Sequence, residues 1–89
     1  MKPLLVGDRA DVLVLDDQIE TLQMLVGLLG VNYTVHPFTQ GPDLLDYVQS
    51  GQPVDLVMLD VVMPAPDGFE VCRQLHALPE MEEVPIIFM

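Results

Sequence analysis

Two short segments of the sequence are apolar at every position and end in acidic residues. Val12–Leu15 is followed by Asp16 and Asp17, and the apolar run that ends at Leu59 is followed by Asp60. Strands with one solvated face alternate apolar and polar residues, so continuous apolar runs of this length are typical of strands buried on both faces in a parallel sheet. A parallel sheet needs a crossover between consecutive strands. The two segments therefore predict an α/β fold.

The rest of the chain alternates between helical and extended patterns. Helices are predicted over residues 18–29, from 41 to about 50, and from 68 to about 78, and further strands over 33–38 and 84–89. The order β-α-β-α-β-α-β implies right-handed crossovers and a parallel sheet with helices on both faces. Pro37 cannot donate to a strand ladder, which favours an edge position for the second strand. We expect the fourth strand to be buried.

Composition narrows the possible functions. The chain has 89 residues, enough for one small domain, and its net charge of −11 repels phosphate backbones, so we expect no nucleic-acid binding by this segment. A single cysteine, Cys72, excludes an internal disulfide and a cysteine-based zinc site. The start, Met1-Lys2-Pro3, lacks a secretory pattern, and no apolar run is long enough to cross a bilayer. We therefore expect a cytoplasmic protein.

The acids after the two apolar strands are the candidate functional residues. Ligands of open α/β sheets bind at the carboxyl ends of the strands, where Asp16, Asp17 and Asp60 meet if their strands are neighbours. Three like charges at close range are costly, and a hard divalent cation such as Mg²⁺ offsets their repulsion. With the metal present, one acid can act as a nucleophile towards phosphorus. A single acid at a strand end is usually only a loop or cap residue. Acids at the ends of two strands in the same β-α-β-α-β arrangement are harder to explain in that way.

Asp16-Asp17 after an apolar strand, Leu59–Pro64 and Asp67-Gly68 together resemble the receiver domain of two-component response regulators. The spacing Asp-x-x-Met-Pro-x-x-Asp-Gly is specific, and the resemblance covers residues 11–89 after a leader of residues 1–10. It implies a flavodoxin-like, doubly wound parallel sheet with strand order 2-1-3-4. It also implies a phosphoacceptor signalling domain and not an enzyme in the ordinary sense.

Carried over position by position, the resemblance assigns roles to individual residues. Asp60 would accept a phosphoryl group from a histidine kinase or phosphotransfer protein and so control an output domain outside these residues. Asp17 would bind Mg²⁺ directly and Asp16 mainly through water, with Asp60 and the backbone carbonyl of Val62 completing the protein ligands. The Val62 side chain occupies the position where the family tunes the lifetime of the phosphoryl group. Valine cannot position an attacking water, so we expect slow self-dephosphorylation.

The sequence also departs from the family pattern. Receivers of this kind carry a Thr or Ser just after the fourth strand and a Lys at the end of a fifth, whereas the only lysine here is Lys2. The fifth strand and the last two helices have no counterpart. We therefore expect a truncated receiver in which Asp60 binds metal but is phosphorylated poorly. Its fourth strand, Pro85–Met89, would be a bare apolar edge that favours a non-native oligomer.

Two other functions are compatible with parts of this pattern. A receiver-like interaction module that binds partners without phosphotransfer would have the same strand ends, and a phosphodonor assay separates it from a phosphoacceptor. An aspartyl-phosphate hydrolase on a similar sheet would want a second acid two residues after its nucleophile. Position 62 is valine, which disfavours the hydrolase.

The remaining polar residues are predicted to be structural. Asp67 is expected at the N-terminus of the third helix, and Asp55 is expected as a capping or turn acid at the opposite end of the sheet. Gly68 is expected to supply backbone freedom where the loop enters the helix. His36 and Cys72 are expected in ordinary surface or packing roles.

Overall fold

The computed structural model describes residues 9–64 and 66–89. In chain order its elements are β1 (Asp11–Leu15), α1 (Ile19–Leu29), β2 (Thr34–Phe38), α2 (Gly41–Gln49), β3 (Leu56–Leu59), α3 (Gly68–His76), a 3₁₀ helix (Pro79–Met81) and β4 (Ile86–Phe88). The predicted alternation of strands and helices is confirmed. Most of the predicted leader, residues 1–10, lies outside the described residues, so its boundary stays a prediction.

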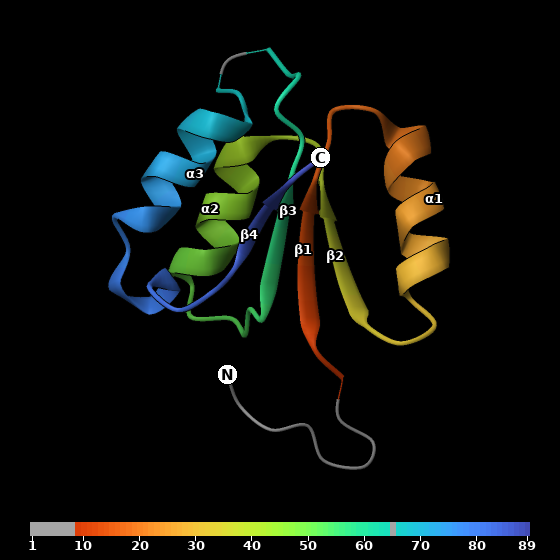
Figure 1. Ribbon diagram of the computed structural model, residues 1–89, viewed down its shortest axis with the longest axis horizontal. Helices are drawn as coiled ribbons and strands as arrows, with labels where there is room; N and C mark the ends of the chain where they lie inside the picture. The colour runs from red at the N-terminus through yellow and green to blue at the C-terminus, as the bar shows by residue number, and fades with distance from the viewer. Residues whose placement is uncertain (1–8, 65) are drawn as a thin grey trace.

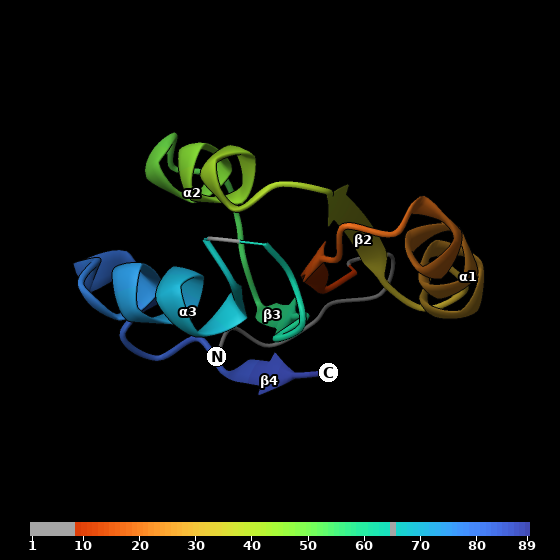
Figure 2. The same ribbon diagram turned by 90° about the horizontal axis from the view of Figure 1, so that it is seen from above.

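All four strands are parallel and lie in the order β2-β1-β3-β4. The helices α2 and α3 cover one face of the sheet, and α1 lies on the other side, next to β2 (Figures 1 and 2). This is the predicted doubly wound, flavodoxin-like arrangement. The carboxyl ends of the strands point to the top of Figure 1.

The central strand β1 explains why its sequence is apolar at every position. Leu13 and Leu15 point into a larger core cluster with residues of α2 and α3, whereas Val12 and Val14 belong to a smaller cluster with Leu22 of α1. Both sets are almost completely inaccessible to solvent. Because successive side chains of a strand point to opposite faces, a strand between two helix layers needs apolar residues at both.

The burial predicted for the fourth strand was wrong. The fourth strand was expected to be buried, but Ile87 and Phe88 are exposed and only Ile86 is half-buried. Phe69 of the third helix is also exposed, while Cys72 on the same helix is buried. In α1 only Leu22 is buried, because this helix lies beside the edge strand β2 and covers little of the sheet (Figure 2).

The edge position predicted for the proline-containing strand is confirmed. Pro37 lies in β2, which pairs with β1 on one side and with no strand of the described chain on the other. In the part of the chain that the structure covers, no helix is long and apolar enough to cross a membrane.

Candidate functional site

The pairing of β1 with β3 brings the acidic strand ends together. Leu15 is the register partner of Leu59, and the Asp60 N–H donates a hydrogen bond of 2.9 Å to the Leu15 carbonyl. Asp16, Asp17 and Asp60 each offer a carboxylate oxygen, and these oxygens lie within 4.8 Å of one another. The structure therefore brings together the three acids on which the predicted site depends.

The three carboxylates differ in their exposure to solvent. Asp16 is 7% exposed, Asp60 is half-buried and Asp17 is exposed. Burial raises the pKa of the Asp16 carboxyl, and the negative charges of Asp60 and Asp17 raise it further, while a hydrogen bond from the Gln18 N–H to Asp16 Oδ1 (2.9 Å) lowers it. The Asp16 carboxyl therefore holds its proton more tightly than a free aspartate does, with a raised pKa.

Asp60 and Val62 are connected through the backbone. The Val62 N–H donates to Asp60 Oδ1 at 2.9 Å, which fixes the orientation of the carboxylate and leaves Oδ2 outside this bond. The Val62 side chain is 80% exposed, so it stands at the solvent side of the site. The role of the Val62 carbonyl as a metal ligand stays a prediction.

The donor set fits a hard divalent cation. Octahedral Mg²⁺ places neighbouring oxygen ligands about 3 Å apart and opposite ones about 4.2 Å apart, close to the spacing of the three carboxylates. Within residues 9–64 and 66–89 neither arginine balances their charge, because Arg9 donates to the carbonyls of Gly30 and Val31 and Arg73 pairs with Glu70. A bound cation is therefore the natural source of compensating charge.

Gly68 lies against the backbone of Asp60, directly after β3. A Cβ atom built on Gly68 would lie 2.3 Å from the Asp60 carbonyl oxygen and 2.9 Å from its carbonyl carbon. Gly68 does not have a positive φ, so the predicted reason for this glycine was wrong: the position requires space and not backbone freedom. The neighbouring Asp67 is the N-cap of α3, as predicted, and its Oδ1 accepts from the Glu70 N–H at 3.0 Å.

A pocket of about 370 Å³ opens beside the acids, between the loops that follow β2 and β3. Its lining includes Asp17, Thr39, Pro42, Met63 and Pro64. The acids can therefore be approached from solvent past a partly apolar wall.

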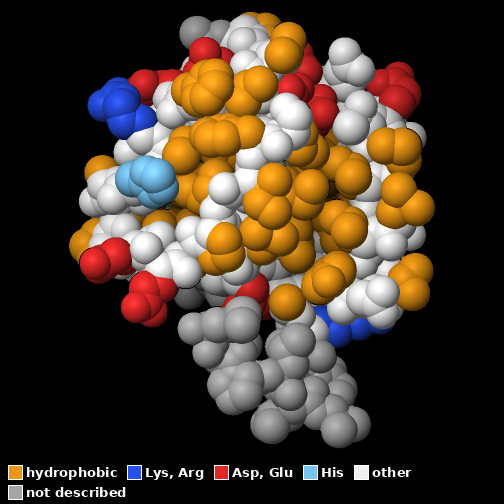
Figure 3. All heavy atoms as spheres, viewed as in Figure 1, with side chains coloured by type: hydrophobic (Ala, Val, Ile, Leu, Met, Phe, Trp, Pro, Cys, Tyr) orange, Lys and Arg blue, Asp and Glu red, His pale blue; other side chains and the backbone are white. Residues whose placement is uncertain are grey.

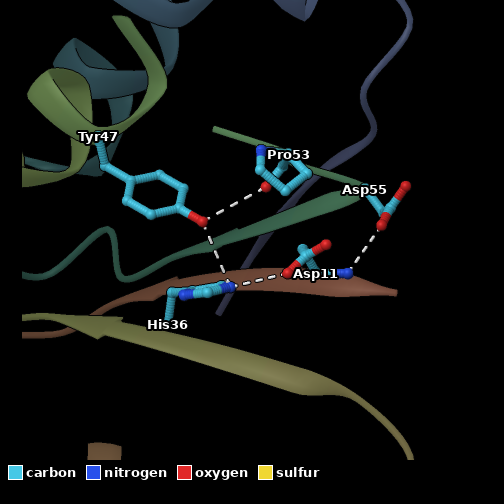
Figure 4. Close-up of polar contacts among 5 residues, drawn as sticks. All are labelled: Asp11, His36, Tyr47, Pro53 and Asp55. Carbon is cyan, nitrogen blue, oxygen red and sulfur yellow. Dashed lines mark hydrogen bonds and ion pairs between the residues drawn. The ribbon is translucent and has the colours of Figure 1, made fainter. Parts of the chain in front are cut away.

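A second polar cluster, at the amino ends of the strands, was missed by the sequence reasoning (Figure 4). His36 Nε2 contacts Asp11 Oδ1 at 2.9 Å and the Tyr47 hydroxyl at 3.3 Å, and Tyr47 also donates to the Pro53 carbonyl at 3.5 Å. Asp55 accepts from the Asp11 N–H at 2.7 Å, which confirms the predicted capping role. An ionised carboxylate only accepts, so Nε2 carries the proton. Both partners share that one nitrogen, so the group is a structural tie between β1, β2 and α2 and not a catalytic relay.

Comparison with known proteins gives the family. The response regulator receiver domain profile matches residues 12–89. The response regulator MprA of Mycolicibacterium vanbaalenii is 39% identical over 79 residues, and the cyclic di-GMP phosphodiesterase response regulator RpfG of Xanthomonas campestris is 33% identical over 90. The structure of the chemotaxis response regulator CheY4 of Vibrio cholerae aligns with a TM-score of 0.83 at 29% identity. The chain belongs to the response regulator receiver domain family.

The extent of these matches differs between the relatives. They cover 88% of this chain but 33% of MprA, 93% of this chain but 24% of RpfG, and 91% of this chain and 68% of CheY4. The chain therefore spans a third or less of these two curated relatives. Within them it corresponds to the receiver, a signalling domain of two-component systems.

Replacing Gly68 by alanine tests the close approach of α3 to the Asp60 backbone. We expect Gly68→Ala to lower the free energy of unfolding by about 1–3 kcal/mol, because the new methyl group meets backbone atoms that cannot rotate away. Gly27→Ala is the matched control: a Cβ at Gly27 meets nothing within 4 Å, so this helical substitution should stabilise by about 0.5–1 kcal/mol. Urea unfolding of both variants measures the difference. Equal effects of the two substitutions would contradict the assignment.

The raised pKa of Asp16 predicts a pH dependence of stability in the presence of a chelator. The folded chain holds the Asp16 proton more tightly than the unfolded chain, so this contribution to stability is complete below the unfolded pKa, about 3.9, and is lost as pH rises through the folded pKa. Asp16→Asn keeps an oxygen for the Gln18 N–H but does not ionise. We expect the variant to become increasingly more stable than the wild type as pH rises from about 4 to 7. A difference that does not change with pH would contradict this.

Proposed function

We propose that Asp60 accepts a phosphoryl group from a histidine kinase or phosphotransfer protein in the cytoplasm, and that this modification controls an output domain. The observation that carries the proposal is the convergence of the Asp16, Asp17 and Asp60 carboxylates within 4.8 Å at the carboxyl ends of β1 and β3. Membership of the receiver family supports the same role for these residues.

Asp60 is the acid best placed to react. Its Oδ1 is held by the Val62 N–H, so Oδ2 is the oxygen that forms the bond to phosphorus. In the transfer this oxygen bonds to the phosphorus as the bond from phosphorus to the donor's histidine nitrogen breaks, and the electron pair of that bond returns to the imidazole ring. The product is an acyl phosphate on Asp60.

Asp16 and Asp17 would hold Mg²⁺ together with Asp60 and the Val62 carbonyl. When bound, the ion supplies positive charge to the incoming phosphoryl oxygens. The half-burial of Asp60 and the exposure of Asp17 leave one side of the site open, next to the pocket between the loops after β2 and β3. A donor histidine approaches from that side.

The output is proposed from the relatives alone. MprA and RpfG are both named as response regulators, and RpfG is also named as a cyclic di-GMP phosphodiesterase. A receiver joined to a separate effector is therefore the arrangement that we propose for the whole protein. The competing proposal is an interaction module that binds its partners without phosphotransfer.

A phosphodonor assay separates these two proposals. Residues 1–89 are incubated with Mg²⁺ and acetyl phosphate, and intact mass spectrometry should show the slow addition of one phosphoryl group, because the acceptor and its metal ligands are together. The gain should disappear in Asp60→Asn and when the metal is chelated.

Asp67→Asn is the matched control for this assay. The asparagine side chain keeps an oxygen that can cap α3, and the Asp67 carboxylate is not one of the three clustered acids, so this variant should still be modified. A mass gain that persists in Asp60→Asn would refute the assignment of the acceptor. No gain in a folded wild-type chain that binds Mg²⁺, and none in a longer version that also carries the family's Thr or Ser and its Lys, would favour the interaction module.

The exposed Val62 predicts a long-lived acyl phosphate. The valine side chain cannot hold an attacking water by a hydrogen bond, and it is exposed at the site. In Val62→Asn the amide can form such a hydrogen bond, which we expect to raise the rate of dephosphorylation about five- to tenfold. We expect the phosphoryl group to be lost faster by that factor from Val62→Asn, followed by intact mass after removal of the donor. Val62→Thr, of similar shape, separates polarity from size. Loss from the wild type within seconds would contradict the prediction.

A further inference from the structure

The acids of the candidate site lie where strands end, so their positions depend on the segments that hold these strand ends. Asp and Glu side chains are visible near the top of Figure 3, the end to which the carboxyl ends of the strands point in Figure 1. Asp16 is held from the neighbouring strand as well as from its own, because its N–H donates a hydrogen bond of 3.1 Å to the Phe38 carbonyl at the end of β2. A displacement of the chain at the end of β2 would therefore reach Asp16 through this hydrogen bond.

The connection from β2 to α2 is short and leads to a buried glycine. Two residues separate Phe38, the last residue of β2, from Gly41, the first residue of α2. The buried face of α2 consists of residues at helical spacing, namely Gly41, Leu44 and Val48. Gly41 is the member of this face that has no side chain, so the helix can approach a neighbour most closely at its first residue.

A side chain at position 41 has no room. A Cβ atom built on Gly41 would lie 2.6 Å from Cγ2 of Val71 in α3 and 3.4 Å from Cγ of Pro66. Val71 is fully buried, and a β-branched residue in a helix has one strongly preferred rotamer, so its methyl group has little freedom to move aside. Gly41 does not have a positive φ. The glycine is therefore required by the close approach of α2 to α3, which lie side by side in Figures 1 and 2.

The pocket of about 370 Å³ beside Asp17 lies between the same two parts of the chain. Residues 39–42 form one wall, and residues 63, 64 and 66 of the loop after β3 form the other. Gly41 and Pro66 are neighbours from opposite walls. The contact of α2 with α3 therefore fixes the separation of the two walls as well as the position of the chain after β2.

We propose that Gly41 is a positioning residue for the cation site, because it lets α2 begin against α3 and so holds the end of β2 where the Asp16 carboxylate can share a cation with Asp17 and Asp60. This inference rests on the metal site of the proposed function. Gly41 supplies no ligand atom and acts through the Phe38 carbonyl and Asp16.

The geometry of the ion makes such a role measurable. A side chain at position 41 would move the start of α2 away from Val71, and the short connection would carry that displacement to the Phe38 carbonyl. Mg²⁺ tolerates little departure from octahedral coordination, so a small displacement of one carboxylate lowers its affinity.

The first experiment compares the wild type with Gly41→Ala, Val71→Ala and the double variant by heteronuclear NMR without metal. Gly41→Ala should shift the amide resonance of Asp16, because the hydrogen bond from this amide to the Phe38 carbonyl changes. Val71→Ala removes the methyl group that the new Cβ would meet, so the Asp16 resonance of the double variant should return towards its wild-type position.

The second experiment titrates the same chains with Mg²⁺ and follows the amide resonances of Asp17 and Asp60. We expect Gly41→Ala to weaken Mg²⁺ binding about tenfold, as the loss of a contact that supports a metal ligand does, and the double variant to recover most of that loss.

Val48→Ala is the matched control for both experiments. It also changes a buried position of α2 and should lower the stability of the fold, but it lies near the end of the helix that is farther from β2. The Asp16 resonance and the Mg²⁺ affinity of this variant should match those of the wild type. Circular dichroism of each variant establishes that it is folded.

Two results would overturn the role of Gly41. The first is an Asp16 resonance and an Mg²⁺ affinity that are the same in folded Gly41→Ala as in the wild type. The second is an equal change in Gly41→Ala and Val48→Ala, which assigns the effect to stability. A wild-type chain that binds no Mg²⁺ refutes the metal site itself, and the spectra without metal then still decide whether Gly41 positions Asp16.

Discussion

The parallel pairing of β1 with both β2 and β3 is the constraint on which the rest of the structure depends. It buries β1 between two helix layers, which requires an apolar residue at every position from Val12 to Leu15. The same register aligns the last residues of β1 and β3, so the acids that follow them become neighbours. The core and the functional site are therefore two consequences of a single alignment of strands.

The aspartates at the two ends of the sheet differ in how their negative charge is stabilised. At the amino ends, Asp11 and Asp55 are satisfied by the chain itself, through His36 and a backbone N–H. At the carboxyl ends, Asp16 and Asp60 each accept one backbone N–H, and the charge of the three-carboxylate cluster is not balanced by either arginine. Repulsion within such a group of acids lowers the stability of the fold, and a bound cation would relieve it.

Much of the architecture followed from the sequence because local patterns decide it. Continuous apolar runs identified the buried strands, and Pro37 identified an edge. The error in burial arose where burial depends on neighbours that no local pattern reveals: Ile87 and Phe88 of β4 have apolar side chains but are exposed. The tie between His36 and Tyr47 joins two elements whose relative placement is fixed only by the fold. Gly68 was recognised as structural for the wrong reason, because a close backbone approach leaves no trace in the turn pattern.

The contact between Gly68 and Asp60 has a mechanical consequence. Main chain rests directly on main chain, with no side chain between them to absorb a displacement. The start of α3 and the backbone at the end of β3 are therefore in close contact. A displacement of the Asp60 peptide would therefore press on the start of α3, which packs with α2 on one side of the sheet.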